Sequence, residues 1–513
     1  MTPSSMAPLR ATSAAGAPLD HVDVLIIGAG LSGIGAACHL RTDSPGTSFA
    51  ILEARQSSGG TWDLFRYPGI RSDSDMYTLG YSFRPWPGAK AIADGPSILS
   101  YIRDTARDYG VGDTIRYGHR VAQAEWSSEQ SRWTVEVEKA DTGETTQLSC
   151  GFLYTCTGYY RYDQGYSPVF PGIEHFGGQV VHPQHWPEDL DYAGKRVVVI
   201  GSGATAVTLV PAMAEQAAHV TMLQRSPSYV VTVPARDPIA DRLRRLLPKK
   251  TAYSIIRWKN VLLTMLSYQL SRRRPKLMKS LLRKGLEKEL PAGYDFATHF
   301  TPRYNPWDQR MCLVPDGDLF KALSSGRASI ETGTIETFTE QGLRLTSGTE
   351  LEADVVVTAT GLNMQVLGGV RLLVDGQVVR LSDTVGYKGM MFSGVPNLAA
   401  AMGYTNASWT LKCDLVSQYV VRLLAHMREQ GYRQVVPRWT QPTAPTRPFV
   451  DLASGYVLRS VADFPKQGDA APWRLYQNYL RDIALFRYGK LEDEALEFSS
   501  GDAVAVEAEQ AAA

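Results

Sequence analysis

Two glycine-rich turns, each placed directly after a short β-branched run, constrain the fold of this 513-residue chain more than any other feature. The first turn follows residues 22–27 and has G-x-G-x-x-G spacing; its glycines are Gly28, Gly30 and Gly33. The second follows residues 196–200 and has G-x-G-x-x-A spacing; its small residues are Gly201, Gly203 and Ala206. A buried strand, a glycine turn and a helix together begin a dinucleotide-binding unit. The sequence therefore predicts an α/β fold with two Rossmann-like dinucleotide-binding domains.

The residues after the first turn match what a bound flavin dinucleotide needs. A helix is expected through His39, and a second strand, 49–52, ends at Glu53. Glu53 stands 20 residues after Gly33, where a carboxylate can accept hydrogen bonds from a ribose. A glycine turn without a ligand is the alternative, but the sequence of strand, glycines, helix, strand and acid argues against it. The following loop, 59–73, suits a flavin and is not needed for a nicotinamide, so we expect FAD here.

The second unit differs from the first at the ribose position. Gln224 takes the place of Glu53, and Arg225 follows at once. An acid would repel a 2′-phosphate, whereas a guanidinium can bind one through two hydrogen bonds. Arg225 could instead be a solvated arginine at a strand end, but its position beside the ribose favours phosphate binding. The sequence therefore predicts that this unit takes NADPH in preference to NADH.

The order of these motifs predicts the domain organisation. We expect an FAD-binding domain formed by 21–158 and 383–498, and an NADPH-binding domain at 159–382. A helical insertion rich in Lys and Arg, 236–294, interrupts the second domain. It could present a solvated helix face, contact an anionic membrane surface, or form a wall of a substrate cavity; the sequence leaves all three open. Disordered ends are expected at 1–20 and 499–513.

Composition narrows the functional classes. The net charge of +1 gives no electrostatic argument for a nucleic acid partner. The five cysteines form no C-x-x-C pair and have no metal-ligand spacing, so we expect reduced thiols and no metal site. The first 18 residues lack the apolar core of a secretory signal, and no later apolar run is long enough to span a bilayer. A soluble cytoplasmic protein is the expectation.

A third motif lies between the two units, with the spacing F-x-G-x-x-x-H-x-x-x-W-P. Its residues are Phe176, Gly178, His182, Trp186 and Pro187. With both glycine turns, this motif makes the chain resemble the class B flavoprotein monooxygenases, and among them the Baeyer–Villiger monooxygenases. Related N- and S-oxygenating enzymes carry tyrosine at the position of Trp186. The phrases at 61–69, 305–310 and 404–410 resemble the ethionamide-activating branch, and the resemblance extends from about residue 22 to about residue 498.

The resemblance implies a reaction and a site. NADPH would reduce FAD, the reduced flavin would capture O₂ as a C4a-peroxide, and this peroxide would attack a ketone to give an ester or lactone. Sulfide oxygenation is a second implied activity. By resemblance, Arg310 is the cation that stabilises the developing negative charge, and Asp73 holds and tunes it. His182 is expected to hold the linker and couple NADPH docking to oxygenation without direct proton transfer. Many relatives have Lys where this chain has Gln309, so NADPH preference rests more on Arg225.

The residues expected to contact the two cofactors are Gly28, Gly30, Gly33, Glu53, Gly60, Thr61, Trp62, Asp73, Tyr77, Val121, Gly201, Gly203, Thr205, Ala206, Arg225, Thr360 and Gly361. Two other enzyme classes remain as alternatives. One is a monooxygenase of heteroatoms that has no ketone activity. The other is an NADPH-dependent flavin reductase, although such reductases commonly add a redox disulfide for which this chain has no cysteine pair.

Overall fold

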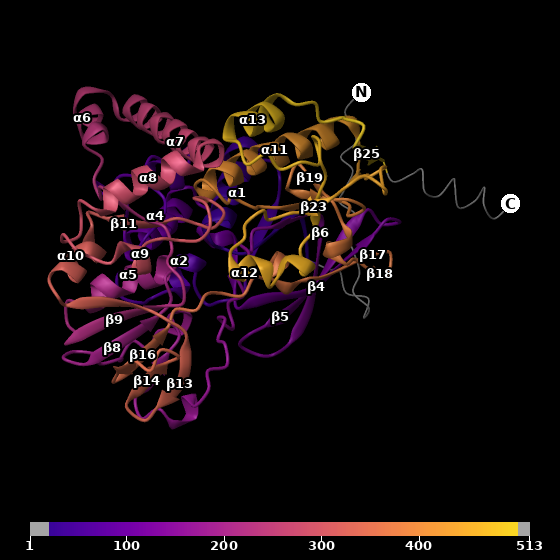
Figure 1. Cartoon of the computed structure of the whole chain (residues 1–513). Helices are drawn as coiled ribbons and strands as arrows, with labels where there is room; N and C mark the ends of the chain where they lie inside the picture. Colours follow the sequence, from indigo (N-terminus) through magenta and orange to yellow (C-terminus); the bar gives the residue numbers. More distant parts are fainter. Residues whose placement is uncertain (1–19, 501–513) are drawn as a thin grey trace, which may run out of the picture.

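The computed structural model describes residues 20–500 (Figure 1). The predicted leader and tail therefore lie almost wholly outside the described residues. Asp20, the last residue of the predicted leader, is the first residue of strand β1, and Ser499, the first residue of the predicted tail, is the last residue of strand β25. Two main sheets organise the chain, and a group of helices extends from one side of the molecule (Figure 1).

The first sheet contains the first glycine turn. Its strand order is β18-β17-β4-β5-β6-β1-β2-β3, and β21 also pairs with β6. The strands are β1 Asp20–Ile27, β2 Phe49–Glu53, β3 Ile115–Tyr117, β4 His119–Ser127, β5 Arg132–Lys139, β6 Thr145–Thr155, β17 Arg371–Val374, β18 Gln377–Val378 and β21 Leu398–Ala400. Val24, Leu25 and Ile26 are completely buried, as expected for a parallel strand covered on both faces. Helix α1, Leu31–Asp43, follows the turn as predicted.

The second sheet contains the second glycine turn and is parallel throughout. Its order is β12-β9-β8-β16-β7. The strands are β7 Gln179–Val181, β8 Arg196–Ile200, β9 His219–Gln224, β12 Ala328–Thr332 and β16 Val355–Thr358. Helix α5, Ala204–Met213, follows the turn. Both predicted strand–turn–helix units are present, and the predicted α/β class is confirmed.

The chain returns to the first sheet earlier than the sequence suggested. Strand β17 pairs with β4, with Arg371 opposite Gln123, whereas the sequence predicts that the second unit extends to residue 382. The reason is that the apolar residues of β17 complete the core of the first sheet, where Leu372 is buried with Trp126. Such long-range pairing has no local signal in the sequence.

Three helices occupy the predicted insertion between β10, Val230–Val233, and β11, Cys312–Pro315. They are α6 Pro238–Leu246, α7 Lys249–Arg273 and α8 Pro275–Leu286. Helix α7 packs on the short helix α3, Met76–Leu79, of the first unit. Arg257 of α7 fixes this contact, because its Nη1 donates to the carbonyl oxygens of Tyr77 at 2.8 Å and Gly80 at 2.7 Å.

The other α-helices and strands complete the two units. The remaining helices are α2 Thr61–Leu64, α4 Gly95–Asp108, α9 Phe296–His299, α10 Asp318–Ser324, α11 Trp409–Gln430, α12 Gly455–Leu458 and α13 Tyr479–Ile483. The remaining strands are β13 Ile335–Thr339, β14 Gly342–Leu345, β15 Glu350–Glu352, β19 Gly386–Tyr387, β20 Met391–Phe392, β22 Gln434–Pro437, β23 Arg447–Pro448, β24 Lys466–Gln467 and β25 Leu496–Ser499. All five cysteines are buried free thiols. Within residues 20–500, no helix has the length and apolar character needed to cross a bilayer.

Candidate active site

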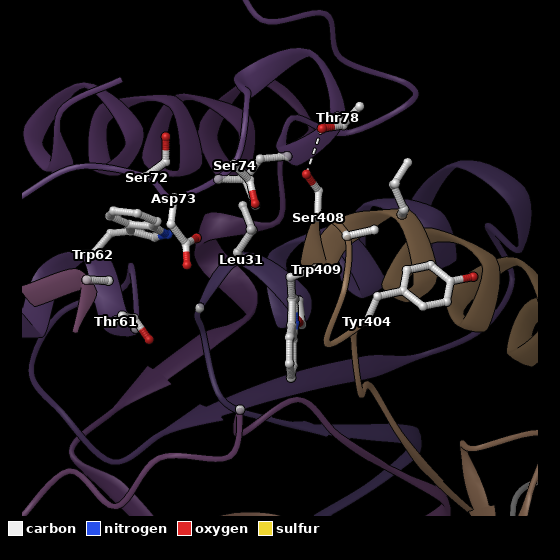
Figure 2. A pocket seen from close by; sticks show the side chains of 18 of the residues that line it. Leu31, Thr61, Trp62, Ser72, Asp73, Ser74, Thr78, Tyr404, Ser408 and Trp409 are labelled. Atoms are coloured by element: carbon white, nitrogen blue, oxygen red, sulfur yellow. Dashed lines mark hydrogen bonds between the residues drawn. The ribbon is translucent and has the colours of Figure 1, made fainter. Parts of the chain in front are cut away.

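A cavity of about 1340 Å³ lies where the first glycine turn, the loop after β2, helix α5 and helix α7 meet. Figure 2 shows part of its lining, with Trp62 and Asp73 on one side and Trp409 and Tyr404 on the other. Of the predicted site residues, those that line the cavity are Gly28, Gly30, Glu53, Gly60, Thr61, Trp62, Asp73, Val121, Thr205 and Arg310. Residues far apart in the sequence are therefore brought together at this site.

The first glycine turn is packed so closely that side chains have no room. A Cβ on Gly33 would stand 1.8 Å from the carbonyl oxygen of Gly28, and one on Gly28 would stand 2.8 Å from that of Cys156. Gly28 also has φ +101, in the region that favours glycine. Gly30 faces the backbone of Gly60 across the cavity wall, 3.4 Å from its Cβ position. The turn thus presents bare backbone and the start of α1 to the cavity, which fits the pyrophosphate of a dinucleotide.

Glu53 lies at the end of β2, on the cavity wall, as the sequence predicted. Its carboxylate accepts hydrogen bonds from the backbone N–H of Ala29 at 2.8 Å and of Arg55 at 3.0 Å. Burial raises the pKa of Glu53 above its ordinary value, and the two backbone donors oppose that shift. A carboxylate fixed beside the glycine turn is a suitable acceptor for ribose hydroxyl groups. The turn and this acid together fit the adenosine half of FAD.

Arg310 and Asp73 form an ion pair at the cavity, with 2.8 Å between Nη1 of Arg310 and Oδ2 of Asp73. Both side chains line the cavity and are partly exposed. Tyr159, together with Asp73, raises the pKa of Arg310 further above its ordinary value, so the guanidinium keeps its charge. The Nε of Arg310 is buried, and in the described chain no hydrogen-bond acceptor reaches it. The site therefore holds a permanent cation at the cavity wall.

An aromatic group near this pair was missed in the sequence. The ring centroids of Tyr159 and Trp409 lie 5.0 Å apart, and Tyr160 also lines the cavity. Trp409 is oriented by its indole N–H, which donates to Ser32 Oγ at 2.8 Å. The sequence offers only indirect signals for this group. Tyr159 and Tyr160 directly follow Gly158, shortly after β6 ends, and Trp409 belongs to the phrase 404–410, which carries family resemblance.

The linker motif lies outside the cavity lining and belongs to the second sheet. Strand β7 falls within the motif and pairs with β16 as the sheet edge. Gly178 is required there, because a Cβ would stand 2.4 Å from the carbonyl oxygen of Asp354. The ring of Phe176 packs on Phe338 with centroids 5.9 Å apart, and Trp186 contacts the core of the second unit.

His182 joins the linker to the end of β16. Its Nδ1 accepts from the backbone N–H of Gln184 at 3.2 Å, and its Nε2 lies 3.3 Å from the carbonyl oxygen of Gly361. A ring that accepts at one nitrogen and donates at the other is neutral. Burial lowers the pKa of His182, which agrees with this state. Thr360 supports the same junction, since its hydroxyl donates to the carbonyl oxygen of Tyr166 at 2.5 Å.

The second glycine turn is more open than the first. Gly201 is still confined, with a Cβ position 2.4 Å from the carbonyl oxygen of Ala359, but Gly203 has no atom within 4 Å of its Cβ position. Thr205 on α5 reaches the cavity. Gln224 is buried and donates to the carbonyl oxygen of His299 at 2.9 Å, whereas Arg225 is exposed. An exposed arginine next to an open helix start can receive a phosphate from solvent.

Tyr77 is placed differently from the sequence expectation. It does not line the cavity: its ring packs near Tyr253 of α7, with centroids 6.4 Å apart, and its hydroxyl accepts from Arg244 of α6 at 3.4 Å. The short helix α3 directs this side chain into the contact with the inserted helices. Tyr77 therefore lies behind the cavity lining, and the cofactor contact predicted for it stays a prediction.

Comparisons with known proteins agree with this geometry. The family described as flavin-binding monooxygenase-like matches residues 90–367, and the NAD(P)-binding Rossmann-like domain matches 26–91. FAD-containing monooxygenase EthA of Mycobacterium tuberculosis (strain ATCC 25618 / H37Rv) is 56% identical over 481 residues, which cover 94% of this chain and 98% of EthA. Probable FAD-binding monooxygenase AlmA of Acinetobacter baylyi (strain ATCC 33305 / BD413 / ADP1) is 49% identical over 480 residues, covering 93% and 96%.

Solved structures share the fold at low sequence identity. An oxidized steroid monooxygenase bound to NADP has a TM-score of 0.73 at 23% identity, covering 93% of this chain and 99% of the other. An ε-caprolactone-bound cyclohexanone monooxygenase has a TM-score of 0.70 at 19% identity, covering 94% and 100%. From the family match and the close relatives, this chain belongs to the flavin-binding monooxygenase-like family.

Proposed function

We propose that this chain is an NADPH- and O₂-dependent flavin monooxygenase that inserts oxygen next to a ketone carbonyl, giving an ester or a lactone, and that it also oxygenates sulfides. The ion pair of Arg310 and Asp73 at the cavity carries the proposal. Oxygen insertion at a ketone places negative charge on the former carbonyl oxygen, and a fixed cation lowers the energy of that state. The Phe176–Pro187 motif, which ends in Trp186-Pro187, supports the same choice.

The first unit would hold FAD through the backbone of the Gly28 turn and the Glu53 carboxylate. Bound FAD supplies the redox chemistry, accepting electrons from NADPH and activating O₂. The role of Arg310 is to stabilise developing negative charge in the cavity, and Asp73 keeps the guanidinium oriented toward it. The rings of Tyr159 and Trp409 exclude water from this region and offer an apolar surface to a substrate.

The second unit would hold NADPH. The open start of α5 at Gly203 and the exposed guanidinium of Arg225 suit the phosphates, and Thr205 links this helix to the cavity. His182 would act as a positioning residue, because it ties the linker to the strand end that carries Gly361. In this proposal residues 21–158 and the chain from β17 onward form the FAD-binding unit. The free thiols are consistent with a cytoplasmic location.

Product analysis tests the proposed reaction. The flavin-loaded enzyme is mixed with NADPH, O₂ and either phenylacetone, 2-octanone or thioanisole, and products are identified by mass spectrometry. We expect esters from at least one ketone and the sulfoxide from thioanisole. Sulfoxide without any ester would reject ketone oxygenation and favour the heteroatom-oxygenating alternative. NADPH consumption that yields hydrogen peroxide alone in every case would favour a flavin reductase.

A further inference from the structure

The three inserted helices concentrate positive charge. Residues 238–286, which contain α6, α7 and α8, include fourteen Lys and Arg and a single acid, Asp241, so this span carries +13 in a chain of net charge +1. The rest of the protein is correspondingly acidic. Figure 1 shows the three helices together at one side of the molecule. We call the exposed side chains of α6, α7 and α8 the insertion surface.

Most of these cations are not neutralised by the protein. Within residues 20–500, no carboxylate lies within 4 Å of the charged groups of Arg242, Arg245, Lys249, Lys250, Arg273, Arg274, Lys276, Lys279 and Lys284. The paired exceptions are Arg257, Lys259, Arg272 and Arg283. Nine unneutralised cations on one group of helices create a strong local positive potential.

The insertion surface is also apolar. On α7 the exposed side chains Ile255, Trp258, Leu262 and Leu266 recur every three or four residues and therefore form one stripe along the helix. Leu266 is 64% exposed, and Leu246 of α6 is 68% exposed. Helix α8 adds Leu277 and Leu281, four residues apart. Exposed apolar side chains gathered on neighbouring helices are typical of an interaction site, in contrast to isolated ones.

The stripe on α7 continues into the cavity. Leu263, next to Leu262, lines the cavity and is 56% exposed, and Ile239 of α6 lines it and is 58% exposed. The polar side chains of Thr264 and Asn260 belong to the same wall. The ion pair of Lys259 and Asp237 also lies on this wall. The insertion surface and the cavity are therefore joined by exposed apolar side chains of α6 and α7, beside one neutralised ion pair.

We propose that the insertion surface docks on an anionic lipid bilayer. Helices that carry both exposed leucines and unpaired cations bind at the headgroup level: the apolar side chains enter the boundary of the acyl chains and the cations contact lipid phosphates. Because α6, α7 and α8 remain folded against the protein and do not span, the docking is peripheral. It places the cavity entrance at the lipid surface, from which an apolar substrate reaches the site. The docking itself is independent of the reaction proposed above.

Sedimentation with vesicles tests the proposal. The flavin-loaded protein is centrifuged with vesicles of phosphatidylcholine alone, or with vesicles that also contain about 40 mol% phosphatidylglycerol. The anionic lipid gives the second kind of vesicle a negative surface potential. We expect binding to the anionic vesicles and little to the neutral ones. Replacing three cations, as Arg273→Gln/Arg274→Gln/Lys276→Gln, should weaken anionic binding by about 100-fold, since each contributes about a factor of five. Leu262→Gln/Leu266→Gln should weaken it about tenfold or more through lost apolar burial.

A matched control removes the same charge elsewhere. Arg371, Arg380 and Arg433 are exposed and outside the three helices, and Arg371→Gln/Arg380→Gln/Arg433→Gln should bind anionic vesicles like the wild type. An equal loss in this control, or no vesicle binding by the wild type, overturns the proposal. The alternative occupant of the insertion surface is a second copy of this chain, and the molar mass from light scattering tests it. If the wild type self-associates, the leucine variant does not, and neither binds vesicles, the surface is an interface between copies. None of these readouts depends on turnover.

Discussion

The two glycine turns differ most at their second glycine and at the residue that ends the following strand. A Cβ on Gly30 would stand 3.4 Å from the Cα of Gly60, whereas a Cβ on Gly203 would have no atom within 4 Å. The first glycine is confined in both turns, and the place of Gly33 is taken by Ala206 in the second. The acid of the first unit, Glu53, is buried and held by two backbone donors, while Arg225 at the end of the corresponding strand of the second unit is exposed. One sequence pattern thus serves two environments.

This difference indicates two kinds of ligand site. An enclosed turn with a fixed acid suits a ligand that stays bound, and an open turn with an exposed cation suits a ligand that must enter and leave in each cycle. The proposed roles of FAD and NADPH require this division. The cavity with Arg310 is lined by residues of both units. A substitution in one unit, in the other or at Arg310 can therefore be distinguished by its effect on flavin content, nicotinamide preference or oxygen transfer.

The largest effect is expected from an added methyl group at the enclosed turn. Gly33→Ala forces a backbone shift, which should cost at least about 1–3 kcal/mol and release the flavin. Gly203→Ala, the same substitution at an open position of the second turn, is the control, and its unfolding free energy should stay within about 0.5 kcal/mol of the wild type. The flavin-to-protein absorbance ratio and denaturant unfolding measure both. Equal flavin content in the two variants would contradict the difference between the turns.

Removing the cation between the units should abolish most oxygen transfer while leaving both units folded. For Arg310→Ala we expect ester formation to fall by about 10²–10³-fold, the size of effect seen when one group that stabilises developing negative charge is lost. Arg303→Ala, an exposed arginine of the same loop, is the control and should keep its rate. Loss of flavin in Arg310→Ala would show that the residue is structural.

A change beside the second glycine turn should alter the preference for NADPH over NADH. Arg225→Ala should raise the KM for NADPH by about 10- to 100-fold, the value of a hydrogen bond to a charged group, and change the KM for NADH little. Arg327→Ala, an exposed arginine just before β12, serves as control. Steady-state oxidation of the two nicotinamides measures the ratio. If both KM values rise equally, Arg225 does not bind the 2′-phosphate.

The smallest effect concerns the junction at His182. Because the pKa of His182 is lowered in the folded protein, the unfolded chain takes up its proton first as pH falls, and stability is lost below the ordinary value near 6.5. His182→Asn, which can also accept and donate, should lose less stability between pH 7.5 and 5.5. The difference should be on the order of 1 kcal/mol, because one proton bound only by the unfolded chain costs at most about 1.4 kcal/mol per pH unit below 6.5. Denaturant unfolding at both pH values measures it, and identical pH slopes would refute a neutral His182.

Local patterns predicted much of the fold. Both glycine turns, the strands before them and the place of Glu53 at the end of β2 were predicted correctly, because backbone crowding and the strand–turn–helix order are properties of short segments. The ribose contact of Glu53 stays a prediction. The insertion was predicted as helical but its use was left open, and the structure places α7 in the cavity wall through residues such as Val261 and Thr264. The direction of the Tyr77 side chain has no signal in the sequence, since it depends on which helix packs against α3.

The sequence by itself determined two dinucleotide-type turns, a charged insertion and a linker motif. Only the tertiary structure decided how they meet. Arg310 and Asp73 are 237 positions apart, and His182 reaches Gly361 across 179. These contacts depend on how the two sheets, the returning strand β17 and the inserted helices pack, and such long-range packing leaves no local pattern in the chain. The resemblance to a family named Arg310 and Asp73 beforehand, but their distance and their place in the cavity come from the folded protein.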